Sequence, residues 1–207
     1  MTEIRIDTVG APLDQPTLLG PSVELVRRAG AAGLLPGHDP IQRLDLGLLR
    51  TIARAAMAAG VGHDAALGLV HAREPERLVT FIRGLDDALA ESPLPDRELR
   101  ELLRIFDTET LAALVSTSAM SIRRYAAAER RPSDNVAGRI HWLALVVSDL
   151  AGAYNAFGIR RWFDRRRAQL DGRSPREFLG ADWDPAGAAA ERVGALAAAL
   201  AGAGAAT

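Results

Sequence analysis

The clearest structural pattern of this chain lies in residues 110–134, TLAALVSTSAMSIRRYAAAERRPSD. Apolar residues recur three and four positions apart on both sides of Ser116–Ser118, which is typical of two short helices joined by a tight turn. The apolar face that holds the two helices together consists of Leu111, Leu114, Val115, Ile122 and Tyr125. The segment therefore predicts a helical pair, whose second helix runs from Ala119 to about Ala128.

The outward side chains of this helical pair are mostly small and polar or cationic. Two serines, with Met120 near them, lie at the N-terminal end of the second helix, two arginines follow within a turn, and two more lie just beyond the helix. Such a helix fits the major groove of DNA, which is about 12 Å wide. We expect the serines and the first arginine pair to approach bases or nearby phosphates, and the second pair to contact the backbone. The candidate DNA contacts are Ser118, Ser121, Arg123, Arg124, Arg130 and Arg131.

Charge is distributed unevenly along a chain whose formal net charge is only −1. Residues 119–176 hold 12 Arg and 5 acidic residues, whereas residues 1–118 hold 12 Arg and 17 acidic residues. A local excess of positive charge attracts phosphate backbones. The distribution therefore favours binding of nucleic acid by the second half of the chain.

The first half of the chain predicts an irregular leader followed by helices. We expect residues 1–39 to be irregular, because prolines and glycines are scattered through them. Residues 40–95 are expected to form an N-terminal helical region of unknown role, with helices over Pro40–Ala59 and Pro75–Glu91. Pro93-Leu94-Pro95 then indicates a boundary, because two prolines in three residues cannot continue a helix.

The second half is expected to begin a new unit at Asp96. Residues 96–157 predict a first helix as far as Phe106, the helical pair, and a long helix that ends near Phe157. Residues 158–207 are expected to form a small C-terminal helical region with an Ala/Gly tail. The predicted fold class is therefore all-α: a helical bundle with a helix-turn-helix, a long central helix and a small C-terminal region.

The sequence offers little for catalysis or metal binding. It has no cysteine, and its four histidines lack the spacing of metal ligands. We find no phosphate-cradling loop with lysine, no nucleophile elbow and no zinc-binding HExxH motif. We therefore expect that the protein is not an enzyme and that it has no catalytic residue, cofactor or bound metal. The histidines are His38, His63, His71 and His141.

The expected location is the cytoplasm. Charged residues are mixed into Met1–Val9, where the apolar core of a secretory signal would lie. The longest weakly polar stretches are interrupted by charge or glycine, so we expect no membrane-spanning helix. The lack of cysteine fits a reducing compartment.

The helical pair and the residues after it resemble the Xre-type helix-turn-helix. In that family the recognition helix is followed by the pattern Ser/Glu-Gly-Glu-Arg-x-Pro-Ser, and Ala127–Ser133 here reads AAERRPS. Two positions depart from the family pattern, because Ser116 and Ala128 stand where glycine is common. The resemblance implies a DNA-binding module, and we expect a homodimer that recognises an inverted-repeat operator.

A second resemblance lies between Trp162 and Leu179. The order of Trp162, Leu170-Asp171-Gly172, Ser174-Pro175 and an apolar pair is similar to the C-terminal toxin-binding region of Xre/MbcA/ParS-type antitoxins. In those proteins a final apolar helix follows, for which Val193, Leu196 and Leu200 are suitable. Together the two resemblances cover about residues 96–203.

These resemblances imply an antitoxin that represses its own operon and neutralises a RES-domain toxin, an enzyme that consumes NAD. Family members use the C-terminal region to block the active-site cleft of the toxin. The arginines between Arg160 and Arg167 could face that partner, DNA or solvent, and the sequence does not decide among these. The candidate toxin contacts are Arg160, Arg161, Trp162, Arg165, Pro175 and Phe178.

Two other classes of function remain open. The first is a stand-alone helix-turn-helix regulator in which residues 40–91 bind a ligand or another protein. The second is a structural or adaptor protein, because serines and arginines also decorate short helices in ordinary bundles. An adaptor predicts no salt-sensitive DNA binding.

Overall fold

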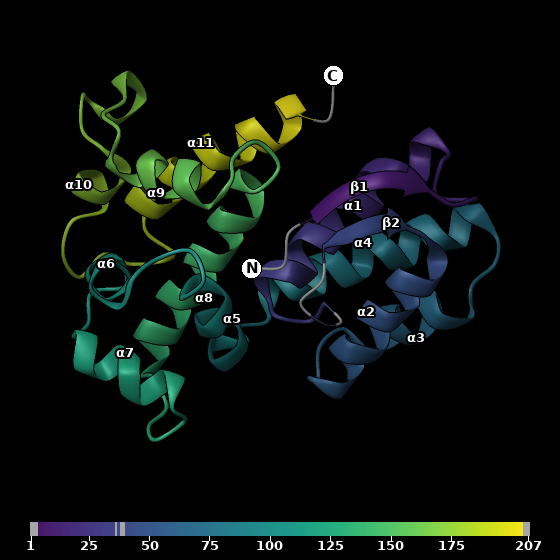
Figure 1. Ribbon diagram of the computed structural model, residues 1–207, viewed down its shortest axis with the longest axis horizontal. Helices are drawn as coiled ribbons and strands as arrows, with labels where there is room; N and C mark the ends of the chain where they lie inside the picture. The colour runs from purple at the N-terminus through teal and green to yellow at the C-terminus, as the bar shows by residue number, and fades with distance from the viewer. Residues whose placement is uncertain (1–3, 36, 38–39, 205–207) are drawn as a thin grey trace. The chain divides into compact units, whose positions relative to one another are not determined.

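The structure, a computed structural model, describes residues 4–35, 37 and 40–204 (Figure 1). Its described residues are mostly helical with two short strands, which confirms the predicted all-α class. The chain divides into two compact units, an N-terminal unit of residues 1–93 and a C-terminal unit of residues 94–207. The boundary falls within the Pro93-Leu94-Pro95 segment. His38 and the last three residues of the Ala/Gly tail lie outside the described residues.

In its described residues, the N-terminal unit combines a two-stranded parallel sheet with four helices. Strand β1 pairs with β2 from Ile4 opposite Ile41 to Val9 opposite Leu44. Helix α1 packs on α4, which packs on α3, and α3 packs on α2. The elements are β1 (Ile4–Val9), α1 (Pro16–Ala31), β2 (Ile41–Leu44), α2 (Leu46–Ala58), α3 (His63–His71) and α4 (Pro75–Glu91).

Helix α1 corrects the expectation of an irregular leader over residues 1–39. Pro16 occupies the first turn, where its missing N–H is tolerated, but Pro21 lies inside the helix. Burial of Leu18, Leu25 and Val26 in the core outweighs that interruption. An ion pair of 2.7 Å between Arg28 Nε and Asp86 Oδ1 adds a polar link from α1 to α4.

The helix expected over Pro40–Ala59 begins later, because its first residues form β2. Ile41 and Leu44 have a spacing that suits a helix, but they pair with β1 instead. Asp45 then begins α2 by accepting a hydrogen bond of 2.9 Å from the Leu48 N–H. The expectation that residues 40–95 start with a helix is therefore wrong, because the helix begins about one and a half turns later, at Leu46.

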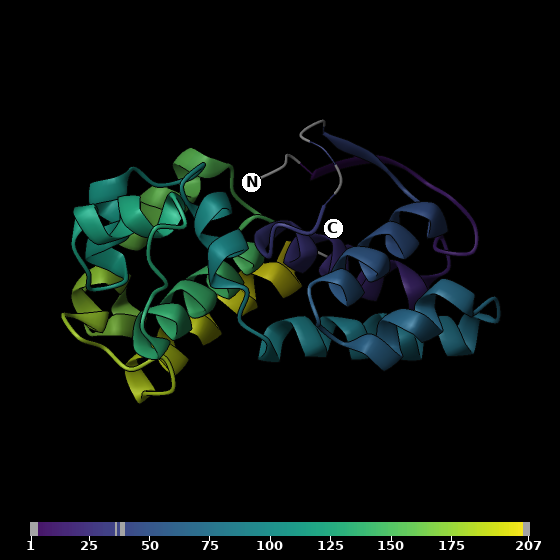
Figure 2. The same ribbon diagram turned by 90° about the horizontal axis from the view of Figure 1, so that it is seen from below.

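The C-terminal unit is built around α8, against which α5 and α11 pack (Figure 1). Helix α6 packs on α7, which also contacts α5, and α10 lies against α9 and α11. Figure 2 shows the same helices from below. The elements are α5 (Pro95–Leu102), α6 (Thr108–Leu114), α7 (Ala119–Ala126), α8 (Asp134–Leu150), α9 (Ala156–Asp164), the 3-10 turn η1 (Ala168–Leu170), α10 (Pro175–Leu179) and α11 (Ala188–Gly204).

The long central helix ends earlier than the sequence suggests. Helix α8 stops at Leu150, and the Asn155 side chain caps a separate helix, α9, by accepting from the Gly158 N–H at 2.9 Å. Phe157 is exposed at the start of α9 and does not pack along α8. The first helix is also shorter than predicted, because α5 ends at Leu102 and a turn leads to Phe106.

The core of the C-terminal unit contains aromatic rings and a buried pair of polar side chains. The ring of Phe163 lies edge-on to Phe106 and to Trp162, with centroid distances of 5.7 and 5.1 Å. His141 Nδ1 lies 2.6 Å from Glu98 Oε1, and both side chains are buried between α8 and α5. His141 is therefore a core residue with a hydrogen-bond partner. Among the described residues, no helix is long and apolar enough to cross a bilayer.

Candidate nucleic-acid interface

Helices α6 and α7 form the helical pair that the sequence predicts, and each begins at a side-chain cap. Asp107 accepts hydrogen bonds from the Thr110 N–H and hydroxyl at 2.7 and 2.8 Å, and these bonds lower the pKa of the Asp107 carboxyl. Ser118 caps α7 by accepting from the Ser121 N–H at 3.1 Å. Ile122 and Tyr125 of α7 are buried, as are Leu111 and Leu114 of α6.

Both short helices end in the same left-handed turn. After α6, Ser116 has φ of 54°, and the N–H groups of Ser116 and Thr117 donate to Ala113 and Ala112. This bond pattern is a Schellman motif, in which the left-handed position is usually glycine. The turn fixes the angle at which the chain leaves α6 and enters α7.

The turn after α7 repeats this geometry at Ala128, whose φ is 57°. The N–H groups of Ala128 and Glu129 donate to Tyr125 and Arg124, both at 3.0 Å. Ser116 and Ala128 are the two positions at which the Xre-type pattern has glycine. The backbone conformation that favours glycine is therefore present at both positions, although neither residue is glycine.

The six candidate DNA contacts lie together on α7, its N-cap and the loop after it, but some of them already have polar partners in the chain. The hydroxyls of Ser118 and Ser121 are 2.9 Å apart and bond to each other. Arg123 Nη2 lies 2.8 Å from Glu109 Oε1 of α6. The other three arginines among these candidates, Arg124, Arg130 and Arg131, are exposed. In the described part of the chain they form no ion pair.

The Arg123–Glu109 pair does not remove Arg123 from consideration as a DNA contact. The Arg123 side chain is 57% exposed and the Glu109 side chain is 67% exposed. Pairs at such exposure contribute about 0.2 to 1 kcal/mol and are screened by salt. A phosphate could therefore compete with Glu109 for this guanidinium group.

Three residues from distant parts of the C-terminal unit hold the end of α6, and we call them the α6 clasp: Arg139, Asp182 and Trp183. The Trp183 indole N–H donates to the Leu114 carbonyl at 2.9 Å. Arg139 is only 3% exposed and donates to the carbonyls of Trp183 at 2.7 Å and Val115 at 3.4 Å. The Asp182 N–H donates to the Ser116 hydroxyl at 3.2 Å.

The α6 clasp thus satisfies the two carbonyls at the end of α6 and contacts the turn residue itself. Sequence reasoning missed it, since Trp183 and Leu114 are 69 residues apart in the chain. The one local signal was Arg139, an arginine among the mostly apolar residues of the long helix. Such an arginine is rarely buried without specific partners.

The candidate toxin contacts in the C-terminal region differ in exposure. Arg161 and Arg165 are exposed, and Phe178 is half-buried with the guanidinium groups of Arg173 and Arg192 at 4.5 and 5.0 Å from its ring. Trp162 and Pro175 are buried, so they support this surface and do not form it. The remaining candidate is Arg160, which donates to the Ile105 carbonyl at 2.7 Å and so links α9 to the turn after α5.

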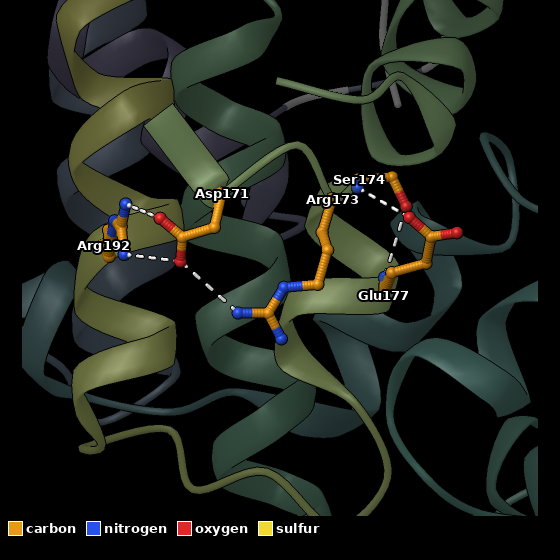
Figure 3. Close-up of polar contacts among 5 residues, drawn as sticks. All are labelled: Asp171, Arg173, Ser174, Glu177 and Arg192. Atoms are coloured by element: carbon orange, nitrogen blue, oxygen red, sulfur yellow. Dashed lines mark hydrogen bonds and ion pairs between the residues drawn. The ribbon is translucent and has the colours of Figure 1, made fainter. Parts of the chain in front are cut away.

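The Leu170–Gly172 segment forms a tight turn whose acidic residue joins two elements (Figure 3). Asp171 has φ of 57°, and its carboxylate accepts from Arg192 at 2.9 and 3.2 Å and from Arg173 at 3.4 Å. The bond with Arg192 is the main cause that holds the pKa of Asp171 below its ordinary value. The turn is thereby attached to α11.

Helix α10 begins immediately afterwards with a reciprocal cap, which Figure 3 also shows. The Ser174 side chain accepts from the Glu177 N–H at 3.3 Å, and the Glu177 carboxylate accepts from the Ser174 N–H at 2.9 Å. Pro175 occupies the first position of α10, where it is well tolerated. The segment from Leu170 to Pro175 therefore encodes a turn followed by a capped helix start.

No family model, curated protein or solved structure matches this chain. Its functional assignment therefore depends on the geometry of its own residues and on the motifs that they carry.

Proposed function

We propose that the chain is the antitoxin of a type II toxin–antitoxin system that binds DNA to repress its own operon. The observation that carries this proposal is the helical pair α6 and α7. The second helix exposes Met120, Arg123 and Arg124 on the side opposite its buried residues, Ile122 and Tyr125. An exposed, cationic second helix at a fixed angle to the first is the arrangement that enters a major groove.

The charge and end geometry of α7 support this interpretation. Its N-terminal N–H groups carry the positive end of the helix dipole, which attracts phosphate. Arg130 and Arg131 follow its C-terminal turn and are exposed. Since the left-handed turn at Ala128 bends the chain directly before them, these two arginines are suited to the DNA backbone next to the groove.

The second half of the proposal is that the C-terminal region binds and neutralises a RES-domain toxin that consumes NAD. The support is the Trp162 to Leu179 pattern together with the exposed groups beside it. Arg161, Arg165 and Phe157 are exposed on or next to α9, and Arg161 lies 5.7 Å from the Phe157 ring. Arginine beside an aromatic ring is common in protein interfaces.

A homodimer would complete the DNA-binding proposal. Two copies would present two α7 helices about one DNA turn apart, or roughly 34 to 36 Å, to an inverted repeat. The expected mass of the complex with an operator duplex is therefore that of two chains and one duplex. Analytical ultracentrifugation of the complex measures this directly.

Two experiments test the proposed function. In the first, the chain is co-expressed with the product of the adjacent gene, and we expect the two proteins to co-purify and cell growth to be rescued. In the second, a mobility shift with the DNA upstream of the operon should show salt-sensitive binding. If the two proteins neither co-purify nor restore growth, the proposed antitoxin role is wrong. If the upstream DNA shows no mobility shift, the proposed DNA binding is wrong.

A stand-alone regulator is the second candidate function. It is favoured by the N-terminal unit, which is compact and has its own core of fully buried residues such as Ile52, Leu69 and Ile82. A unit of this kind could bind a ligand or another protein. An isolated gene with no RES-type neighbour would favour the regulator, whereas an adjacent or overlapping RES-type gene favours the antitoxin.

A further inference from the structure

Helix α7 presents one large apolar side chain to solvent. Met120 is 55% exposed, although methionine is among the residues most often buried. Successive residues of an α-helix are separated by about 100°. Met120 therefore lies on the side of α7 opposite Ile122 and Tyr125, and Arg124 lies about 40° from it on the same side.

The other candidate base contacts on α7 already have partners. Ser118 and Ser121 bond to each other, and Ser118 also caps the helix. Arg123 is paired with Glu109, and the group suited to replace Glu109 in this exposed pair is a backbone phosphate and not a base. In the part of the chain that the structure describes, Met120 and Arg124 are the outward residues of the first two turns of α7 without a polar partner.

The two side chains together fit two base edges in the major groove. Guanine presents the acceptors O6 and N7, to which an arginine donates in a bidentate manner, and thymine presents its C5 methyl group to apolar side chains. Residues four positions apart are separated by about 6 Å along a helix. This spacing corresponds to about two base-pair steps of roughly 3.4 Å each.

We propose that Met120 and Arg124 are the base-reading pair of this chain. Met120 packs on the C5 methyl of a thymine, and Arg124 donates to O6 and N7 of a guanine within about two base pairs of it. The inference rests on the proposed DNA binding and adds its specificity. It shifts base recognition from the serines and Arg123 to a methionine and a single arginine.

The charges around Met120 favour DNA over a protein as its occupant. Arg124 is exposed on the same side of α7, and Arg130 and Arg131 are exposed in the loop that follows. Among the described residues of the C-terminal unit, the other exposed large apolar side chains are Tyr154 and Phe157, near the start of α9. An isolated apolar side chain surrounded by cations is suited to contact one methyl group in a DNA groove. It is less suited to a protein interface, which has an apolar core of several side chains.

Base analogues test this proposal. The duplex is the DNA upstream of the chain's own gene, prepared normally, with uracil in place of thymine, and with 7-deazaguanine in place of guanine. Uracil lacks the C5 methyl, and 7-deazaguanine lacks the N7 acceptor. The proteins are the full-length chain, Met120→Ala, Arg124→Ala and, as a control for removal of one exposed arginine, Arg83→Ala on α4.

The expected result is a crossed pattern of sensitivities. Uracil weakens binding of the unmodified chain roughly fourfold, the change that corresponds to burial of one methyl group, and leaves Met120→Ala unaffected. The 7-deazaguanine duplex weakens binding of the unmodified chain and of Met120→Ala about tenfold, and leaves Arg124→Ala unaffected. Arg83→Ala responds to both analogues as the unmodified chain does.

Three outcomes overturn the proposal. If the unmodified chain binds normal and modified duplexes equally, base reading by this pair is wrong while DNA binding stands. If no duplex binds in a salt-sensitive manner, the proposed DNA binding fails as well. If Met120→Ala keeps its uracil sensitivity but changes the sedimentation mass of the free protein, the occupant of Met120 is a second copy of this chain. Circular dichroism confirms that both variants are folded.

Discussion

At the scale of single residues, Ser116 and Ala128 are the most informative positions. Both adopt the left-handed backbone that L-residues disfavour by about 1 to 2 kcal/mol. Each closes one helix of the α6–α7 pair, so the fold requires this conformation regardless of the side chain. The sequence showed the helices, but it did not show that a serine and an alanine would take the glycine conformation.

Replacing the alanine by glycine should stabilise the protein. Ala128 is exposed, so Ala128→Gly relieves the backbone strain without reducing packing. After subtraction of the entropy of glycine in the unfolded chain, the expected gain is about 0.5 to 1 kcal/mol in the free energy of unfolding. Urea denaturation measures this change.

Ser116→Gly is the matched comparison, because the Ser116 hydroxyl accepts from the Asp182 N–H. Removal of that hydrogen bond should offset the relief of strain, leaving a net change of about zero. A clear decrease in the stability of Ala128→Gly would contradict the left-handed geometry at that turn.

At the scale of elements, local pattern predicted some helices well and others poorly. Helices α6 and α7 were predicted because their apolar residues contact each other within a short stretch of chain. Strand β2 was missed because its partner, β1, begins 37 residues earlier, from Ile4 to Ile41. Helix α1 was missed because Pro21 is a signal for a loop, and only the tertiary core outweighs it.

The candidate site shows the same division. The position of the six candidate DNA-binding residues on and after α7 followed from the sequence. Their partners did not, because Glu109 reaches Arg123 from another helix. The α6 clasp depends on separations of 44 and 69 residues, which no local pattern contains.

The α6 clasp should support the proposed DNA binding, because it holds α6 in position. Trp183→Phe keeps an aromatic ring in the core but leaves the Leu114 carbonyl without its indole donor. We expect a decrease of about 1 to 2 kcal/mol in the free energy of unfolding. Affinity for the upstream duplex should also fall, although Trp183 is buried and lies outside α7.

Arg83→Ala again serves as the control, since it lies in the N-terminal unit. Urea denaturation and fluorescence anisotropy of a labelled duplex measure the two effects of Trp183→Phe. DNA affinity is compared at a temperature at which the unmodified chain and Trp183→Phe are both fully folded. If Trp183→Phe is less stable but binds DNA with unchanged affinity, the clasp does not position the helical pair.

The Asp171 turn predicts a specific decrease of stability in acid. The folded-state pKa of Asp171 is lowered, chiefly by its hydrogen bond with Arg192, so its contribution is present above the unfolded pKa near 3.8. That contribution disappears as pH falls through the lower, folded-state value. Asp171→Asn, which tolerates the left-handed backbone, should therefore be less stable than the unmodified chain at pH 7.

The difference between these two proteins should shrink as pH falls below about 3.8. Urea denaturation at pH 7 and at a series of acidic values measures it. A difference that stays constant over this range would mean that the Asp171 carboxylate is not stabilised by its arginine partners.

At the scale of the whole molecule, both proposed binding functions, for DNA and for a toxin, fall in the C-terminal unit. The C-terminal unit contains the helical pair, the α6 clasp and the Asp171 turn, and the same α8 that holds Arg139 packs against α11. The proposed DNA-binding and toxin-binding regions thus share one core. The N-terminal unit has its own core, so its role can be separated by mutation from that of the C-terminal unit.

The salt dependence of DNA binding tests the central claim most directly. Fluorescence anisotropy with the upstream duplex over a series of salt concentrations gives the slope of log affinity against log salt. Arg130→Ala plus Arg131→Ala should reduce the steepness of that slope by about 0.9 for each phosphate that the variant no longer neutralises, whereas Arg83→Ala should leave it unchanged. Binding that does not respond to salt, or a double variant with the slope of the unmodified chain, would contradict the claim that α7 and its following loop dock on DNA.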